Sequence, residues 1–282
     1  MSEAFLESHR GQWFVVKIGG ELAMDKQGLA YSLGMCLGQM LEAGIRLVVV
    51  HGGGPQATAL SRRLGLKTQH VAGQRITDEA TMEVIKMALA GQASSDLASA
   101  MRMAKVPALC LSGLSAGLVQ AKRLGSIAET PQAPPVDLGF VGRVHWVDTA
   151  LLEKLSGLGL VPVLSSLADD GQGGPLNVNA DSLAAQLAKS LKAQYLFLVS
   201  NVPGVLEEVE KPQSRYAHLN GAQVAKLMAS QKIYGGMVPK VEGALLAARE
   251  SQTHVCLLGL SPPNSLLEAL KHPGSIGTTF EA

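Results

Sequence analysis

The stretch IRLVVVHGGGP (45–55) decides the fold, because it joins a continuous β-branched run to three glycines and a proline. A strand that is apolar at nearly every position, without alternation, suits a parallel sheet that is covered on both faces. The glycines allow a tight turn, and Pro55 suits the first turn of a helix. The stretch therefore predicts a buried strand, a glycine turn and a helix in direct succession.

Similar strand-like runs recur along the chain, and segments with helical periodicity lie between them. The further runs are WFVVKI (13–18), VPALCLS (106–112), LVPVLSS (160–166), AQYLFLVS (193–200) and THVCLLG (253–259). The helical candidates are 28–43, 55–64, 78–104, 148–156, 180–191, 220–229, 238–249 and 263–270. Asp148 and Asn220 are the expected N-caps, while Pro239 and Pro263, like Pro55, suit first turns. This alternation predicts an α/β fold, a three-layer α/β/α sandwich with a mainly parallel central sheet.

One stretch departs from this pattern. Residues 113–146 contain glycines, short alternating pieces and the linker PQAPP (131–135), which predict a β-hairpin insertion. A softer boundary lies near residues 166–176. We therefore expect one domain (1–282) with an N-terminal lobe at about 12–166 and a C-terminal lobe at about 176–282, which share a sheet and hold different ligands.

Composition narrows the classes of protein to which the chain can belong. Lys+Arg number 24 and Asp+Glu 23, so no charge excess suggests nucleic acid or an anionic membrane surface as a partner. The three cysteines lie far apart in apolar runs and are expected to be buried thiols. The N-terminus lacks the apolar core of a secretory signal, and no apolar run is long enough to span a membrane. We expect a soluble cytoplasmic protein.

Three glycine-containing turns follow strands: KIGGE (17–21), HGGGP (51–55) and SNVPGV (200–205). Ligands of open α/β sheets collect at the carboxyl ends of strands, where glycines let backbone N–H groups approach an anion. Neither GxxxxGK[ST] nor GxGxxG is present, so a phosphate site here is of another type. Any one turn can be merely a tight turn, but three on one sheet edge favour an anion site.

Four charged side chains are candidates for such a site. Lys17 ends an apolar strand and is either a surface lysine or a phosphate ligand. Lys240 falls in the first turn of an expected helix, where cations are disfavoured, so its position predicts a nearby anion. Arg75 is either an exposed loop residue or a residue whose forked guanidinium binds a carboxylate. Asp181, in NVNAD (177–181), is either a helix cap or the acceptor that holds both lysines, and the neighbouring asparagines favour the second.

Other chemistry finds no support in the sequence. His51 is expected to be a structural hydrogen-bonding residue. The other histidines show no metal-ligand spacing, and HExxH is missing, so we expect no protein metal site. These histidines are His9, His70, His145, His218, His254 and His272. No GxSxG or Cys/His arrangement indicates a covalent nucleophile.

Seven motifs together resemble the amino-acid kinase family, and within it most closely the acetylglutamate kinases. The motifs are KIGG, VVVHGGGPQ, GQRITDEATMEVIKMALAGQ, VDLGFVGRV, LNVNAD, SNVPGVL and IYGGMVPKVEGAL. The likeness runs from about residue 12 to the final GTTF. KxGG with HGGGP is specific for the superfamily, whereas QRITD, NVNAD and GGMVPK together are specific for the acetylglutamate kinases.

The resemblance implies ATP-dependent phosphorylation of the side-chain carboxylate of N-acetyl-L-glutamate, a step of arginine biosynthesis. Lys17 and Lys240 would stabilise the transferring phosphoryl group, and Asp181 would organise both. The acetylated amino acid would be held in the N-terminal lobe by Gly52, Gly53, Arg75 and Asn177. ATP would be held by Gly20, Asn201, Val202, Pro203, Gly204, Val205, Leu206, Lys232, Ile233 and Tyr234. Mg²⁺ would be held mainly by the nucleotide phosphates. The implied assembly is a homodimer formed through the N-terminal half.

Three positions depart from the family pattern. LSGLSAG (111–117) stands where the family has LSGKDG, LLGLS (257–261) stands where it has IIDGR, and Asn201 stands where aspartate is common. These changes leave two alternatives open. One is a sister kinase for a carrier-protein-linked aminoadipate or glutamate, and the other is a catalytically weakened regulatory or binding homologue. Nothing in the sequence indicates a signalling partner of the PII type.

We predict an arginine-insensitive homodimer. The segment before the first strand, residues 1–12, is shorter than the N-terminal helix through which arginine-inhibited relatives form hexameric rings. LLGLS also lacks part of what those relatives use to bind the inhibitor. Analytical ultracentrifugation should give the mass of a dimer, and millimolar arginine should leave the activity unchanged. A hexamer, or activity that responds to arginine, would contradict this prediction.

Overall fold

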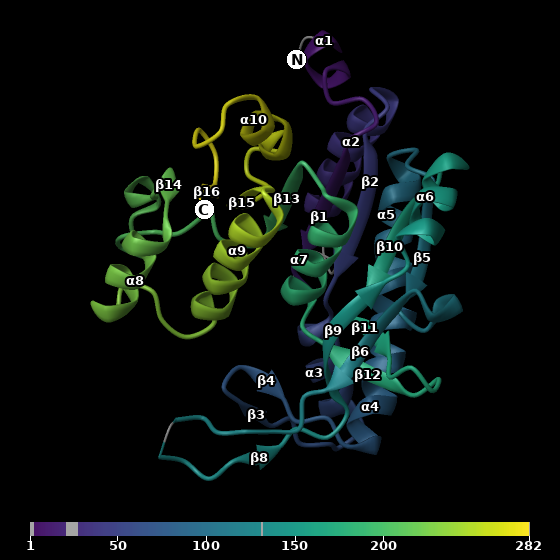
Figure 1. Cartoon of the computed structure of the whole chain (residues 1–282), viewed down its shortest axis with the longest axis vertical. Coiled ribbons are helices and arrows are strands. Elements are labelled where there is room, and N and C mark those ends of the chain that lie inside the picture. The colour runs from purple at the N-terminus through teal and green to yellow at the C-terminus, as the bar shows by residue number, and fades with distance from the viewer. Residues whose placement is uncertain (1–2, 21–27, 131, 282) are drawn as a thin grey trace.

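The centre of the molecule is an eight-stranded sheet with helices on both faces (Figure 1). The computed structural model describes residues 3–20, 28–130 and 132–281. Glu21 of the first glycine turn and Pro131 of the expected linker lie outside the described residues. The strand order is β14-β16-β15-β13-β1-β2-β10-β5. These strands are β14 (His218–Leu219), β16 (Thr278–Phe280), β15 (His254–Leu258), β13 (Tyr195–Val199), β1 (Trp13–Ile18), β2 (Arg46–His51), β10 (Val161–Ser165) and β5 (Ala108–Ser112).

The sheet is parallel apart from one pair. β1 pairs in parallel with β13 and β2, and β2 with β10, whereas β15 and β16 are antiparallel. Every residue of β1 is buried, as is every residue of β10. Strands covered on both faces need apolar side chains at successive positions, which is why their sequences show no alternation. The expected mainly parallel sheet is confirmed.

Two hydrophobic cores separate the sheet from its helical layers. One face packs against α6, α7, α8 and α9, and the other against α1, α2, α5 and α10. Figure 1 shows α7 and α9 lying along the sheet, in front of β1 and β13. The helices are α1 (Glu3–Glu7), α2 (Leu29–Glu42), α3 (Gly54–Arg63), α4 (Glu79–Ile85), α5 (Ser94–Met103), α6 (Thr149–Gly157), α7 (Ala180–Leu191), α8 (Gly221–Ala229), α9 (Met237–Ser251) and α10 (Ser265–Lys271). The three-layer α/β/α sandwich is therefore confirmed.

The expected hairpin insertion is part of a second, smaller sheet that contains more strands than the hairpin. β6 (Val119–Arg123) and β9 (Val141–Val147) pair antiparallel, as a hairpin does. They close into a four-stranded barrel with β11 (Leu167–Asp169) and β12 (Pro175–Val178), which the soft boundary at 166–176 did not suggest. Two short pairs complete the strands: β3 (His70–Val71) with β4 (Gln74–Arg75), and β7 (Ser126–Ile127) with β8 (Val136–Asp137).

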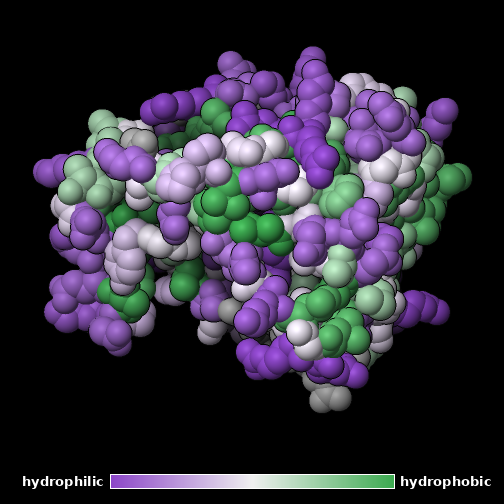
Figure 2. Space-filling view, turned by 90° about the horizontal axis from the view of Figure 1, so that it is seen from below, coloured by the Kyte–Doolittle hydropathy of each residue, from purple (hydrophilic) through white to green (hydrophobic). Residues whose placement is uncertain are grey.

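The end of the molecule that carries β3, β4 and β8 is the lower end in Figure 1. Figure 2 looks onto this end and shows hydrophilic and hydrophobic side chains interspersed over it. Among the described residues, no helix is long and apolar enough to cross a membrane.

Several local predictions are confirmed, two are wrong, and two short strands were not predicted. Asp148 caps α6 by accepting from the N–H of Leu151, and Asn220 forms a full capping box with Gln223. The single helix expected at 78–104 is interrupted by a π-helical segment, η2 (Lys86–Ala93). Pro263 precedes the N-cap of α10 and does not lie in its first turn. The short strands β14 and β16 were not expected, because two or three residues carry no periodic signal.

The cysteines are free thiols, as expected. Cys36 and Cys256 are buried, and Cys110 is half-buried. Burial raises the pKa of Cys36 to about 11 and that of Cys256 to about 12. Thiols with such pKa values carry little thiolate at neutral pH and are therefore poor nucleophiles.

Candidate active site

A buried ion pair joins the central strand to the helix that follows the small sheet. Lys17 is the fifth residue of β1 and only 7% exposed, although it carries a charged side chain. Its Nζ lies 2.8 Å from Oδ1 of Asp181, whose side chain is also largely buried. A buried ammonium group needs such a partner, because removal of a charge from water without compensation is costly. Lys17 is therefore not a surface lysine, and Asp181 is held against it.

The helix N-terminus explains how Asp181 is placed. Asn179 is the N-cap of α7 and accepts a hydrogen bond from the N–H of Ser182. Asp181 follows in the first turn, where the positive end of the helix stabilises an acidic side chain. The interpretation of Asp181 as the cap is therefore wrong, and its carboxylate remains available to Lys17.

The second lysine reaches the same edge of the sheet from α9. Lys240 lies in the first turn of this helix, as predicted, and its Nζ donates to Oγ of Ser200 at 3.1 Å. Ser200 directly follows β13, which is the neighbour of β1, with Ile18 in register with Val199. Both lysines are thus anchored at the carboxyl ends of adjacent strands. Contact between Lys240 and Asp181 remains a prediction.

The first two glycine turns pack against each other. The side chain of Gln56, which is 2% exposed, donates from Nε2 to the carbonyl of Gly20 at 2.8 Å. A Cβ at Gly20 would lie 2.9 Å from Cδ of Pro55 and 3.3 Å from Cα of Gly53. Such distances leave no room for a side chain, so the sequence needs glycine here. The close approach also brings the N-terminus of α3 next to the end of β1.

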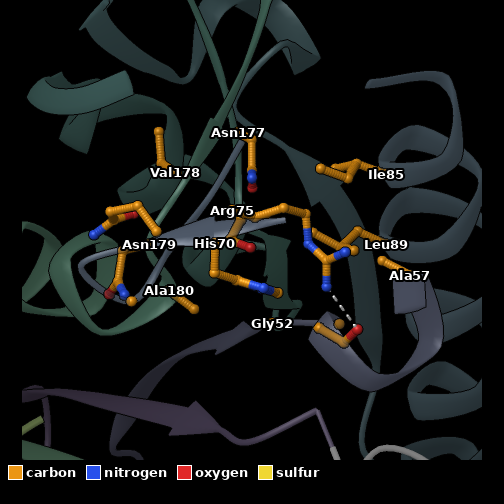
Figure 3. A pocket seen from close by; sticks show the side chains of 15 residues that line it. Gly52, Ala57, His70, Arg75, Ile85, Leu89, Asn177, Val178, Asn179 and Ala180 are labelled. Carbon is orange, nitrogen blue, oxygen red and sulfur yellow. Dashed lines mark hydrogen bonds between the residues drawn. The ribbon is translucent and has the colours of Figure 1, made fainter. Parts of the chain in front are cut away.

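A cavity of about 200 Å³ opens beside the second glycine turn (Figure 3). It is lined by four predicted substrate residues, Gly52, Gly53, Arg75 and Asn177. The remaining lining residues are Gly54, Ala57, His70, Gly73, Gln74, Ile85, Leu89, Ser166, Val178, Asn179 and Ala180. In Figure 3, Arg75 and His70 lie near the centre, with Asn177 above them, Val178 and Asn179 on the left, and Ile85, Leu89 and Ala57 on the right. The structure therefore brings together residues from five separate parts of the chain.

Arg75 makes this cavity electropositive. Its guanidinium is half-buried, and burial lowers its pKa from the ordinary value for arginine. Within the described residues it makes no ion pair, and its hydrogen bonds go to neutral oxygens. Burial also lowers the pKa of His70, and the charge of Arg75 adds to the effect. A positive charge without a carboxylate partner makes the cavity suited to an anion.

A second cavity of about 200 Å³ is lined by the loop that follows β13. Its lining is mainly apolar, and Tyr234 at its edge is 63% exposed. Lys232 in the lining pairs with the carboxylate of Glu207. The lining residues are Val202, Gly204, Val205, Leu206, Val209, Lys232, Ile233, Tyr234 and Met237. Seven of these were predicted nucleotide residues, whereas the predicted Gly20, Asn201 and Pro203 lie outside the lining.

His51 connects the second glycine turn to the π-helical segment. It is fully buried, its Nδ1 lies 2.8 Å from the carbonyl oxygen of Gly52, and its Nε2 lies 2.9 Å from Oγ of Ser94. Ser94 in turn donates to the carbonyl of Leu89. Burial lowers the pKa of His51 below its ordinary value, so the ring is neutral near pH 7. The prediction that His51 is a structural hydrogen-bonding residue is confirmed.

Several residues of the site had no distinct signal in the sequence. Ser200 looked like the end of a strand, and Gln56 looked like an ordinary helical residue. Ile85 and Leu89 line the first cavity from α4 and η2, where they fit the expected helical pattern. His70 is opposite Arg75 in the β3–β4 pair, a register that only the folded hairpin establishes.

Comparison with known proteins identifies the relatives of this chain. The model of the amino acid kinase family matches residues 12–259. The acetylglutamate kinase of Anaeromyxobacter dehalogenans (strain 2CP-C) is 41% identical over 95% of this chain and 98% of its own. The acetylglutamate kinase of Sorangium cellulosum (strain So ce56) is 42% identical over 94% and 93%.

Solved structures agree on the fold. A protein from Streptococcus mutans UA159 superposes with a TM-score of 0.76 at 28% identity, over 87% of this chain and 94% of its own. The carbamate kinase of Giardia superposes with a TM-score of 0.67 at 14% identity, over 96% of this chain and 99% of its own. At such low identity the second likeness concerns the fold alone.

We expect Gly20→Ala to lower the free energy of unfolding by about 1–3 kcal/mol, because the added methyl group overpacks the contact with Pro55 and Gly53. Gly54→Ala is the matched control, since a Cβ there meets nothing within 4 Å. The control should change the stability by less than about 1 kcal/mol. Urea unfolding of both variants measures the difference. Equal stabilities would contradict the close approach of the two turns.

We also expect His51 to make the protein less stable in mild acid. Its folded pKa is lowered, so below an unfolded pKa of about 6.5 the unfolded chain binds more protons than the folded protein. The stability that the neutral ring contributes is therefore present above this pH and is lost as the pH falls. Urea unfolding at pH 7.5 and 5.5 should show a larger loss for the wild type than for His51→Gln, with a slope of up to about 1.4 kcal/mol per pH unit. The same loss in both proteins would contradict this assignment.

Proposed function

The chain belongs to the amino acid kinase family, and from this premise we propose that it transfers the γ-phosphoryl group of ATP to the side-chain carboxylate of N-acetyl-L-glutamate. The product is an acyl phosphate. The acetylglutamate kinases at about 40% identity support this acceptor. We place the reaction in the cytoplasm, as a step of arginine biosynthesis.

The main support for this proposal is the order of the strands β13, β1 and β2 in the sheet. β2 leads into the turn that lines the first cavity, and β13 leads into the loop that lines the second. β1 lies between them in the sheet and carries Lys17. A cation between an electropositive cavity and a mainly apolar one suits the transfer of an anionic group from a nucleotide to a small acid. The reacting atoms would meet at the carboxyl end of β1.

The chemistry requires positioning and charge neutralisation more than proton transfer. The acceptor carboxylate has an ordinary pKa near 4.3 and is ionised at neutral pH, so no general base is required. Two anions repel each other, and a loose phosphoryl-transfer transition state spreads charge over the equatorial oxygens. Lys17 and Lys240 would neutralise that charge. Asp181 holds Lys17 in place and, we propose, orients both ammonium groups.

The first cavity would hold the acetylated amino acid. Gly52 and Gly53 precede α3, and Gly53 as N-cap supplies no side chain that occupies the first-turn N–H groups. Arg75 would bind a carboxylate of the substrate. Asn177 lines this cavity, and its Nδ2 donates to Oγ1 of Thr77 at 3.2 Å, so its amide oxygen would be the acceptor for the acetamide N–H.

The second cavity would hold the nucleotide. Val205, Leu206 and Ile233 offer apolar surface of the kind that a purine ring covers. We propose that Asn201, Pro203 and Gly20 also contribute to binding, as neighbours of this loop and of Lys17. Mg²⁺, held mainly by the phosphates of ATP, would supply further charge neutralisation. In this proposal the lobe at about 12–166 provides most of the acceptor site, and the lobe at about 176–282 provides the ATP site.

The decisive experiment measures acyl-phosphate formation as a hydroxamate, with ATP and either N-acetylglutamate or a carrier-linked aminoadipate. Activity should depend on N-acetylglutamate. Activity with the carrier-linked substrate alone, or with neither acceptor, would refute the proposed acceptor.

Lys17→Ala and Lys240→Ala should each lower kcat on the order of 10²-fold or more, because each removes charge stabilisation from the transition state. Lys154→Ala is the control, since this exposed lysine lies at the end of α6. Thermal unfolding of each variant separates loss of catalysis from loss of fold, which matters because Lys17→Ala leaves Asp181 buried without its partner. Full activity in either variant would refute its assigned role.

A further inference from the structure

We propose that Thr58 and Thr68 are positioning residues that determine selectivity for a substrate with a second carboxylate, by holding Arg75 with uncharged acceptors. This inference rests on the proposed function. It concerns the carboxylate that is not phosphorylated, and it assigns a role to two side chains outside the first cavity's lining.

The guanidinium of Arg75 is held at three points. Its Nη1 donates to Oγ1 of Thr68 at 3.2 Å, and its Nη2 donates to Oγ1 of Thr58 at 2.8 Å and to the carbonyl of Gly54 at 3.2 Å. Figure 3 draws the bond from Arg75 to the glycine turn as a dashed line. Thr58 and Gly54 belong to α3, Thr68 to the loop after it, and Arg75 to β4. Bonds on both terminal nitrogens fix the plane of the group and not only its position.

The chemistry of the acceptors matters as much as their number. Arginine side chains in proteins are commonly held by carboxylates, which would cancel the charge. Within the described residues, two hydroxyls and a carbonyl orient the guanidinium and leave its positive charge uncancelled beside the cavity. The half-buried setting strengthens the attraction to an anion, because solvent screens it less. The threonines therefore prepare Arg75 for a carboxylate without competing as anions.

A dicarboxylate substrate needs two cationic centres. One carboxylate must lie near the lysines at the ends of β1 and α9, since it accepts the phosphoryl group. The other requires a separate partner, and Arg75 lines the cavity in which the substrate would lie. If Thr58 and Thr68 aim Arg75, their removal should weaken recognition of the second carboxylate and leave the phosphoryl transfer itself intact.

The test compares N-acetylglutamate with 4-acetamidobutanoate, which keeps the carboxylate to be phosphorylated and lacks the second one. Thr58→Val and Thr68→Val remove the hydroxyl while keeping the shape of the side chain. We expect each to raise KM for N-acetylglutamate about tenfold, which corresponds to about 1.4 kcal/mol, and to leave kcat and KM for ATP within about twofold. The ratio of kcat/KM for the two acceptors should fall accordingly, and further in the double variant.

Two controls accompany these variants. Thr58→Ser keeps the acceptor oxygen and should restore the wild-type ratio, and Thr149→Val, at the start of α6, should leave it unchanged. An unchanged ratio in a folded double variant would overturn the inference, as would equal losses for both acceptors. A wild-type protein without activity on N-acetylglutamate would overturn the proposed function and this inference together. An active wild type with an unchanged ratio in the variants would overturn only the inference.

Discussion

The ion pair between Lys17 and Asp181 is the contact on which the arrangement of the site depends. It ties β1 to the first turn of α7, and therefore ties the centre of the large sheet to the segment that leaves the small barrel. Buried ion pairs contribute little net stability, because desolvation of both ions offsets their attraction. Apolar residues of similar size would fit this position without that penalty. The charge lies here on β1, between the two strands that lead into the cavities, which favours a role in chemistry over a role in folding.

The cation of the first cavity is held in a different way from Lys17. Lys17 has a carboxylate partner, whereas Arg75 is held only by neutral oxygens within the described part of the chain. A cation that is oriented by neutral groups keeps its charge and attracts an anionic ligand. A cation that is paired with a carboxylate is also oriented, but it attracts an anionic ligand less. The two arrangements suit two tasks. Under the proposed function, Arg75 would bind a charge that stays constant, and Lys17 would meet charge that develops during phosphoryl transfer.

Much of the fold was accessible from the sequence, because continuous apolar strands and helical periodicity are local signals. The limits of β1, β2 and α7 follow from them directly. Contacts between distant segments were not accessible. Ser200 supports Lys240 only because α9 crosses the end of β13, and Gln56 reaches Gly20 only because two turns pack face to face. NVNAD also offers three residues that could cap α7, and only the fold shows that Asn179 does so. Sequence reasoning therefore predicted the charged groups of the site but not the neutral ones that orient them.

The departures from the family pattern concern packing more than chemistry. In LSGLSAG, Gly113 donates its N–H to the carbonyl of Leu167 at 2.8 Å, and Ser115 accepts from the N–H of Ser112. This turn follows β5, one of the two edge strands of the sheet, and β5 lies three strand spacings, about 14 Å, from β1. In LLGLS, a Cβ at Gly259 would lie 3.2 Å from the carbonyl oxygen of Val202, so this segment packs beneath the loop of the second cavity. Leu114 of the first segment packs against the cluster that contains Ile85 and Leu89, two residues of the first cavity's lining. A homologue that only binds ligands would not need the buried ion pair, and its retention beside both cavities favours a working kinase.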